Sequence, residues 1–346
     1  MALPIKPPYA PMEAKLVAQL PTGGEWHYEP KFDGFRCLAF KDDGEVDLRS
    51  KSGQPFNRYF PEVAAALAAL PARRFVLDGE LVVPAGDALS FDELLMRIHP
   101  AESRVAKLAR EHPALFVVFD LLVDEKGKAL VAEPLDQRRA ALERFVEHDT
   151  DADSRVRLAP RVLERGDADE WLESLGTGLD GIMAKRRDLP YQSGERNGMQ
   201  KFKRMRSADC VVGGFRYAAK APVVGSLLLG LYDDAGLLHH VGFTSSIKAE
   251  AKPALTKKLE ALLEEPGFTG NRPGGPSRWS TERSGEWQPL ATELVVEVQY
   301  DHFSGGRFRH GTKFLRWRPD KSPRQSTLAQ VAQETQTPLK LLLEKT

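Results

Sequence analysis

The sequence is poor in cysteine, in net charge and in long apolar segments. Cys37 and Cys210 are its only cysteines, far apart and without a CxxC or His-rich neighbourhood. This excludes a disulfide framework and a zinc site, and predicts two small core residues. Lys plus Arg equal Asp plus Glu, at 49 each, which excludes a globally basic nucleic-acid coat protein. No apolar run approaches the ~20 residues that cross a bilayer, so we expect no membrane association.

The length and composition indicate two globular domains. With 346 residues, 42% hydrophobic and 28% charged, the chain exceeds the roughly 150 residues of a typical compact domain. Its first eight residues lack the basic start, apolar middle and small-residue cleavage site of a secretory signal. We therefore expect a cytoplasmic protein.

The first part of the chain alternates extended segments with short helices. Residues 35–41 and 45–49 flank Asp43-Gly44, which predicts a β-hairpin. Helices are predicted from Pro61, from Ser90 with Glu93 three residues on, and over residues 136–147, with another capped by Asp167. Further extended segments are predicted at residues 75–83, 115–123, 181–184 and 200–203.

After about Arg206 the pattern changes to strands separated by glycine-rich turns, which predicts a small β-barrel with the domain boundary near Ser207. Residues 266–289 are rich in Pro, Gly and Ser without periodicity, and predict a long loop. From residue 302 to residue 324, seven Lys or Arg stand against one Asp, so this stretch can face phosphates or be a solvated strand and tail. Strands are predicted at 210–215, 226–232, 238–243, 293–300 and 313–317, and one helix at 248–263.

Lys31 lies in the segment Glu29-Pro30-Lys31-Phe32-Asp33-Gly34 and could act as a nucleophile. A lysine amine can attack a phosphorus centre when burial and nearby cations lower its pKa. Attack on ATP also requires cations and Mg²⁺ to neutralise the transferring phosphoryl group. A single K-x-D-G motif is more often a solvated loop, so this interpretation needs further charged groups.

Such groups recur along the chain. Asp78-Gly79-Glu80 and Asp180-Gly181, followed by Lys185, each place an acid beside a glycine that allows a close backbone approach. Lys201 and Lys203 share one face of an extended segment. Each pair by itself is more often a surface feature than a site. Residues 176–181 match G-x-G-x-x-G, but they follow a helix and precede a strand, the reverse of a dinucleotide-binding turn.

The order of these motifs resembles the covalent nucleotidyltransferases, and most closely the compact bacterial ATP-dependent DNA ligases associated with non-homologous end joining. The matching motifs are KxDG, DGE, the strand ending in Phe119-Asp120, DGxxxK, KxK and a terminal RxDK box at residues 318–321. The resemblance implies an α+β protein. Residues 1–206 would form a nucleotidyltransferase (ATP-grasp-like) adenylation domain with antiparallel sheets flanked by helices, and residues 207–346 an OB-fold β-barrel domain with a C-terminal tail.

The resemblance also assigns a role to each matching residue. Lys31 would be the nucleophile, Glu29 an adenine contact, and Phe119 an aromatic platform for the adenine ring, although an apolar strand also suits an ordinary core phenylalanine. Glu80 would hold the ribose or a metal. The implied catalytic residues are Lys31, Asp33, Lys201, Lys203, Arg318, Asp320 and Lys321. The implied nucleotide contacts are Glu29, Lys31, Arg36, Lys51, Glu80, Phe119, Lys185, Lys201 and Lys203, and the implied metal ligands are Glu80 and Asp180.

Four positions depart from the family pattern. Lys51 stands where arginine is usual, which replaces a bidentate phosphate contact by a point charge. Asp180 replaces glutamate and shortens the reach to a metal by one methylene. The tryptophan usual before the lysine pair is absent, and His310-Gly311 replaces a proline.

The expected activity is sealing of 5′-phosphate/3′-hydroxyl nicks in duplex DNA through lysyl-AMP, with ATP as AMP donor and Mg²⁺, or Mn²⁺ in its place, as metal. We expect a monomer whose DNA contacts are mainly to phosphates. Because the sequence begins directly with the adenylation domain, we expect a DNA-end-binding repair partner. The alternatives are an RNA ligase or mRNA-capping guanylyltransferase with the same lysine chemistry, and a noncatalytic OB-fold nucleic-acid-binding protein.

Overall fold

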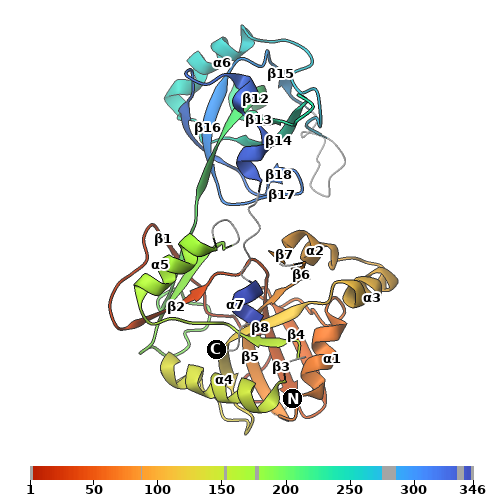
Figure 1. Cartoon of the computed structure of the whole chain (residues 1–346), viewed down its shortest axis with the longest axis vertical. Helices are drawn as coiled ribbons and strands as arrows, with labels where there is room; N and C mark the ends of the chain where they lie inside the picture. Colours follow the sequence, from red (N-terminus) through yellow and green to blue (C-terminus); the bar gives the residue numbers. More distant parts are fainter. Residues whose placement is uncertain are drawn as a thin grey trace. The chain divides into compact units, whose positions relative to one another are not determined.

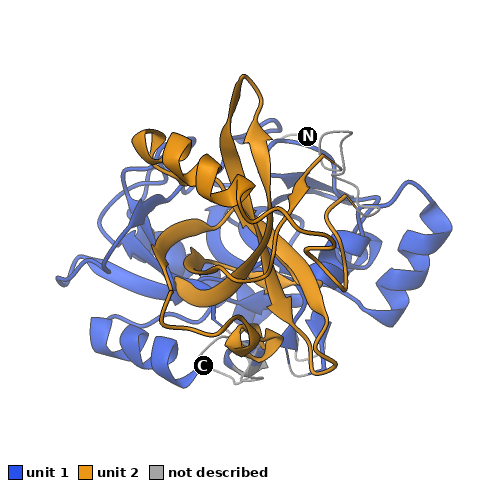
Figure 2. Ribbon diagram, turned by 90° about the horizontal axis from the view of Figure 1, so that it is seen from above, with its two compact units in different colours: residues 1–204, 334–346 blue, residues 205–333 orange. Residues whose placement is uncertain are grey.

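The computed structural model describes residues 3–86, 88–151, 154–175, 179–274, 286–332 and 339–343. Its contacts divide the chain into two compact units (Figure 2). Unit 1 comprises Met1–Arg204 together with Glu334–Thr346, and unit 2 comprises Met205–Gln333. The sequence analysis had assigned the C-terminal tail to the second domain. In the structure the C-terminal helix α7 (Leu339–Leu343) belongs to unit 1 (Figure 1), because Leu339 and Leu342 are buried in its core.

A five-stranded sheet forms the larger half of unit 1. Its strand order is β4-β3-β5-β8-β9, with β3 and β4 joined by the predicted hairpin at Asp43. Apolar side chains bury both faces of β8, whose nine residues are all buried. The bounds are β3 (Phe35–Asp42), β4 (Glu45–Ser50), β5 (Arg74–Val82), β8 (Leu115–Val123) and β9 (Val156–Leu158).

A four-stranded sheet with the order β1-β11-β10-β2 completes the sheets that position the site. Its strands are β1 (Lys15–Val17), β2 (Trp26–Pro30), β10 (Gly181–Arg186) and β11 (Met199–Lys203). The expectation of antiparallel sheets is corrected in one respect. Strands β1 and β11 pair in parallel, as do β8 and β9, so both sheets are mixed. No local pattern marks these parallel pairs, because β1 and β9 have only three residues each.

Helices pack against the sheets of unit 1. The Ser90 hydroxyl accepts a hydrogen bond from the Glu93 amide, as the sequence predicted for the start of a helix. Asp167 does not cap its helix, because Glu164 is the N-cap and Asp167 lies in the first turn. The helices are α1 (Pro61–Ala69), α2 (Phe91–Met96), α3 (Glu102–Glu111), α4 (Leu135–Asp149) and α5 (Arg165–Ser174), of which α3 was not predicted, and β6 (Pro84–Ala85) and β7 (Ala88–Leu89) form a short ribbon.

Unit 2 is built on one curled sheet with the order β14-β13-β12-β16-β19, joined at β12 by β15. Apolar residues of its strands, including Cys210, form a separate core. The edge strand β14 meets the segment before β19 through a single bridge between Thr244 and Thr312. The sheet is therefore a partly open OB-type barrel. Its strands are β12 (Arg206–Ala218), β13 (Ala221–Tyr232), β14 (Leu238–Thr244), β15 (Gln288–Pro289), β16 (Val295–Tyr300) and β19 (Lys313–Trp317), with β17 (Phe303–Ser304) and β18 (Arg307–Phe308) as a separate ribbon.

The helix predicted over residues 248–263 is shorter, as α6 (Lys252–Glu260) preceded by a 3₁₀ turn at Ala249–Ala251. Part of the predicted loop 266–289, and residues 176–178 of the rejected glycine motif, lie outside the described residues. Cys37 and Cys210 are free and fully buried, as predicted. Within the described part of the chain, no helix has the length and apolar character needed to span a membrane.

Candidate active site

Unit 1 contains a cavity of about 170 Å³ between its two sheets. Strand register explains its composition. Arg36 on β3 lies opposite Glu80 on β5, while Glu29, Met183 and Lys201 form one row across β2, β10 and β11. Side chains on paired residues point to the same side of a sheet, so each row presents its groups together. Among the predicted residues the lining includes Glu29, Lys31, Arg36, Lys51, Glu80, Phe119, Lys185 and Lys201.

Lys31 follows β2 and is held beside β10. Its amide donates to the Gly181 carbonyl at 2.9 Å, and its Nζ donates to Asp180 Oδ2. Two motif glycines allow close backbone contacts in the segments around Lys31. A Cβ on Gly181, whose φ is +151°, would lie 1.9 Å from the Phe202 carbonyl oxygen, and one on Gly34 would lie 2.2 Å from the Leu81 carbonyl oxygen. Any other residue would push these strands apart.

The pKa of Lys31 differs from the lowered value predicted from the sequence. Burial lowers the pKa of Lys31, but the Asp180 carboxylate outweighs burial, with smaller contributions from Asp33 and Glu80, so its pKa is raised. In the absence of a ligand, the Lys31 amine is therefore protonated. Neutralising Asp180 would reverse this effect, because its charge is the main cause of the increase.

Asp33 and Asp180, beside Lys31, lie close enough together to share a divalent cation. Oxygens of Asp33 and Asp180 lie within 4.8 Å of each other. Burial raises the pKa of Glu80 to about 7, against the lowering effect of Arg36 and Lys31, and the charges of Asp33 and Asp78 add to the increase. Carboxylate oxygens are the ligands that Mg²⁺ prefers, and a bound cation would stabilise the ionised form of Glu80. The metal ligands predicted from the sequence are Glu80 and Asp180. The structure places Asp33 beside Asp180, and the metal role of Glu80 stays a prediction.

A buried charged cluster lies at the adenine-contact candidate Glu29. Lys185 Nζ is 2.6 Å from Glu29 Oε2, His27 Nε2 is 3.0 Å from Glu29 Oε1, and Arg139 approaches the same oxygen at 3.7 Å. Burial alone would raise the pKa of Glu29, but Lys185, His27 and Arg139 hold it at about 2. Burial also lowers the pKa values of Lys185 and His27.

The positions of His27 and Arg139 beside Glu29 were not predicted from the sequence. His27 could have been found, because alternation along a strand puts it on the same side as Glu29. Arg139 comes from α4, more than one hundred residues away, and no local pattern connects it with the site.

Phe119 lines the cavity, and two cationic side chains lie over its ring. Lys185 Nζ lies 4.1 Å and the Arg36 guanidinium carbon 4.5 Å from the ring centroid. The ring is only 8% exposed. Stacking of adenine on Phe119 thus remains a prediction that requires one of these cations to move.

Arg36 is fixed by a carboxylate behind it. Its Nε and Nη2 donate to the two oxygens of Asp78 at 2.5 and 2.6 Å. The Tyr191 hydroxyl donates to the same carboxylate at 2.6 Å and accepts from the Met12 amide at 2.8 Å. Asp78 and Tyr191 therefore orient Arg36, and neither was assigned a role from the sequence.

The remaining cations of the first domain differ in position. Lys201 lines the cavity, and burial together with Lys31 and Lys203 lowers its pKa. Lys203 of β11 pairs with Gly181 of β10 and is not among the residues that line the cavity. Lys51 is 59% exposed at the cavity mouth and pairs with Glu13 at 2.7 Å. Lys51 thus presents a single positive charge at the edge of the cavity, and its contact with the nucleotide stays a prediction.

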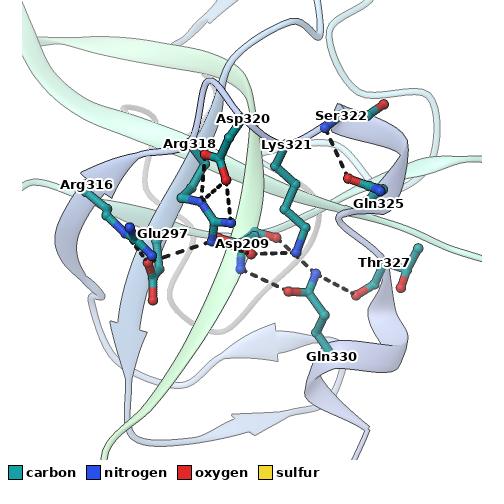
Figure 3. Close-up of polar contacts among 10 residues, drawn as sticks. All are labelled: Asp209, Glu297, Arg316, Arg318, Asp320, Lys321, Ser322, Gln325, Thr327 and Gln330. Carbon is teal, nitrogen blue, oxygen red and sulfur yellow. Dashed lines mark hydrogen bonds and ion pairs between the residues drawn. The ribbon is translucent and has the colours of Figure 1, made fainter.

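The RxDK box forms its own cluster in unit 2 (Figure 3). Arg318 Nη1 donates to both oxygens of Asp209 at 2.8 and 3.0 Å, and Lys321 Nζ donates to Asp209 Oδ2 at 2.6 Å. Arg318 also pairs with Asp320 at 2.9 Å. The hydrogen bonds with Asp320 raise the pKa of Arg318 and hold that of Asp320 at about 2. Asp209 was assigned no role from the sequence, although it contacts both cations. His310 of the departing His310-Gly311 pair contacts Asp301 at 3.0 Å.

Comparison with known proteins agrees with this arrangement. Residues 11–203 match the family described as ATP dependent DNA ligase domain. Residues 220–321 match the family described as ATP dependent DNA ligase C terminal region. The chain is 44% identical to DNA ligase C2 of Mycolicibacterium smegmatis and 40% identical to DNA ligase C of Mycobacterium tuberculosis, covering 96% of each chain in both alignments.

A multidomain relative and a solved structure extend the comparison. The multifunctional non-homologous end joining DNA repair protein LigD of M. tuberculosis is 31% identical over 86% of this chain and 37% of its own length. The solved structure of a Lig E DNA ligase, 18% identical, has a TM-score of 0.55 over 89% of this chain and 99% of its own, and shows the same fold. By sequence, motif order and fold, this chain is a member of the ATP-dependent DNA ligase family.

Proposed function

We propose that this ligase seals 5′-phosphate/3′-hydroxyl nicks in duplex DNA through AMP bonded to Lys31. The observation that supports it most is the position of the Lys31 amine, 82% shielded from solvent and paired with Asp180 beside a cavity that also presents Glu80 and Lys201. A lysine in a solvated loop would have neither this burial nor these neighbours.

The first step joins AMP to the enzyme. After losing its proton, Lys31 Nζ attacks the α-phosphorus of ATP, so that a nitrogen–phosphorus bond forms, the bond to the β-phosphate oxygen breaks and pyrophosphate leaves. Asp180 holds the amine in place before attack. Lys201 faces the cavity and stabilises the negative charge on the α-phosphate.

Two further transfers complete sealing. An oxygen of the 5′-phosphate at the nick attacks the AMP phosphorus and releases Lys31, and then the 3′-hydroxyl attacks the 5′-phosphorus and displaces AMP. Mg²⁺ held by Asp33, Asp180 and Glu80, or Mn²⁺ in its place, would supply positive charge along this path. Arg318, Asp320 and Lys321 orient the pyrophosphate in the first step.

We assign the remaining residues to nucleotide recognition. Glu29, held by Lys185 and Arg139, faces the adenine, while Arg36 and Lys51 contact the ribose or phosphates. Lys203 stabilises phosphate charge together with Lys201. The adenylation domain would be residues 1–206 and the OB-fold domain begin at residue 207.

The substrate is nicked duplex DNA, bound mainly through its phosphates and so sensitive to salt. We propose a monomeric enzyme of the cytoplasm, associated with the nucleoid where its substrate lies. The LigD relatives carry non-homologous end joining in their names, and we extend that pathway and a DNA-end-binding protein partner to this chain.

The test compares covalent labelling with nick sealing. Purified protein is incubated with α-labelled ATP or GTP, and nicked DNA is offered with ATP, GTP or NAD. We expect label from ATP and sealing with ATP alone. Label from GTP without sealing of DNA would favour a capping enzyme, and DNA binding without label would favour a noncatalytic binder. Lys15→Ala is the matched control for Lys31→Ala, since Lys15 is an exposed lysine outside the cavity. It should take label as the wild type does.

A further inference from the structure

Asp209 is the centre of the RxDK cluster in unit 2, although it lies about one hundred residues before the box in the sequence. Two side chains of the box donate to its carboxylate, Arg318 at 2.8 and 3.0 Å and Lys321 at 2.6 Å (Figure 3). Asp209 is 7% exposed. One nearly buried carboxylate therefore brings both cations to a single point.

Hydrogen bonds from one side chain hold the backbone of Asp209. Asp209 lies in β12 opposite Glu297 of β16. The Gln330 side chain accepts from the Asp209 amide at 3.1 Å and donates to the Asp209 carbonyl at 3.1 Å, which fixes the backbone from both sides. A carboxylate on a fixed backbone gives Arg318 and Lys321 defined positions.

The two cations depend on Asp209 to different extents. Arg318 has a second carboxylate, Asp320, at 2.9 Å. In the described part of the chain, Lys321 Nζ has no ion-pair partner other than Asp209. Loss of the Asp209 charge would leave two cations close together without a shared counter-charge, and Lys321 would move away because like charges repel.

The cluster as a whole carries no surplus charge to attract an anion. Three acids balance three bases, since Glu297 pairs with Arg316 at 2.6 Å beside the groups already described. Pyrophosphate must therefore be recognised by the geometry of the donors rather than by net charge. A carboxylate and a phosphate edge both offer two oxygens to a guanidinium, so cations arranged around one are arranged to meet the other.

We propose that Asp209 is a positioning residue for the adenylation step, which holds Arg318 and Lys321 at the spacing needed to engage the pyrophosphate of ATP. This role rests on the proposed function of the RxDK box. Asp209 itself does not touch the substrate and acts through the two cations.

The experiment uses full-length Asp209→Asn, which removes the charge and keeps the size. Three rates are measured: self-adenylation by ATP, release of ATP from the enzyme–AMP form by pyrophosphate, and sealing of a nick already carrying 5′-adenylate. We expect the first two to fall about 10- to 100-fold and the third to stay within about twofold. Asp233→Asn is the matched control, because Asp233 pairs with His239 elsewhere in unit 2, and should leave all three rates unchanged.

A double-mutant cycle tests whether Asp209 acts through Lys321. If it does, adding Asp209→Asn to Lys321→Ala should cost less than it costs the unmodified enzyme. Additive losses would overturn the proposal. Gln330→Ala, which keeps the Asp209 charge but frees its backbone, should slow the same two steps to a smaller extent and provides a second test if Asp209→Asn folds poorly.

Other outcomes each have a definite meaning. Faster self-adenylation in Asp209→Asn would show that Asp209 competes with pyrophosphate for the cations, and equal losses in all three rates would show a role in folding alone; both overturn the proposal. A wild-type protein that takes no label rejects the proposed function. A labelled wild type with an unimpaired Asp209→Asn variant rejects only the role of Asp209.

Discussion

The cavity of unit 1 and the RxDK cluster of unit 2 use charge in different ways. In the cavity, burial and crowding move the pKa values of Glu80, Lys185 and Lys201 towards the neutral forms, while ion pairs keep Glu29 and Lys31 ionised. In the cluster, side chains at the surface pair so closely that Arg318 and Asp320 remain ionised, since the pKa of the first is raised and that of the second is lowered. In the cavity burial thus competes with ion pairing over which groups are charged, whereas in the cluster ion pairing keeps the charge fixed.

The largest expected effect separates the nucleophile from every other group. Lys31→Ala should abolish covalent labelling by α-labelled ATP, a loss of more than about 10³-fold, because it removes the amine that lines the cavity and donates to Asp180. Sealing of a nick that already carries 5′-adenylate should persist, since that step needs no enzyme–AMP bond. Retained labelling would assign the nucleophile to another residue.

The next effect tests the fixed charge of unit 2. Lys321→Ala should slow self-adenylation about 10²-fold and sealing of a preadenylated nick much less, because pyrophosphate leaves only in the first step. Single-turnover rates of both reactions provide the measurement. An equal loss in both steps would contradict the role in orienting pyrophosphate.

A stability measurement examines the cost of the buried acid Glu80. Its pKa of about 7 in the fold exceeds the ordinary value of 4.5, so ionisation destabilises the fold increasingly as the pH rises above 4.5. Glu80→Gln should therefore match the wild type near pH 4.5 and be more stable by roughly 3 kcal/mol at pH 8, while losing activity. Urea unfolding without nucleotide at both pH values provides the measurement, and a variant less stable at pH 8 would refute the prediction.

The smallest effect concerns the proton of Lys31. Asp180→Asn removes the charge that raises the pKa of Lys31, so the alkaline rise of the self-adenylation rate should shift to lower pH, although the plateau falls. A pH profile of single-turnover labelling checks this. The profile of Asp33→Asn offers a comparison, since Asp33 contributes less to the same pKa, and a larger shift in that variant would reverse the assignment.

Sequence reasoning located much of the framework because its signals are local. The Asp43-Gly44 turn fixed a hairpin whose strands begin at the predicted Phe35 and Glu45, and the apolar run of β8 has the predicted bounds. Short strands such as β1 and β9 were missed, since three residues carry too little pattern. The roles of the site residues remain predictions, although eight of them line one cavity.

The sequence by itself determined the family, the two-part organisation and the order of the chemical motifs, because these depend on residue identity and spacing along the chain. Only the tertiary structure decided which charges meet. Arg139 lies beside Glu29, and Asp180 raises the pKa of Lys31. Asp209 forms ion pairs with both Arg318 and Lys321. Ion pairs and burial act through space over a few ångströms, and strand register brings together residues that lie more than a hundred positions apart.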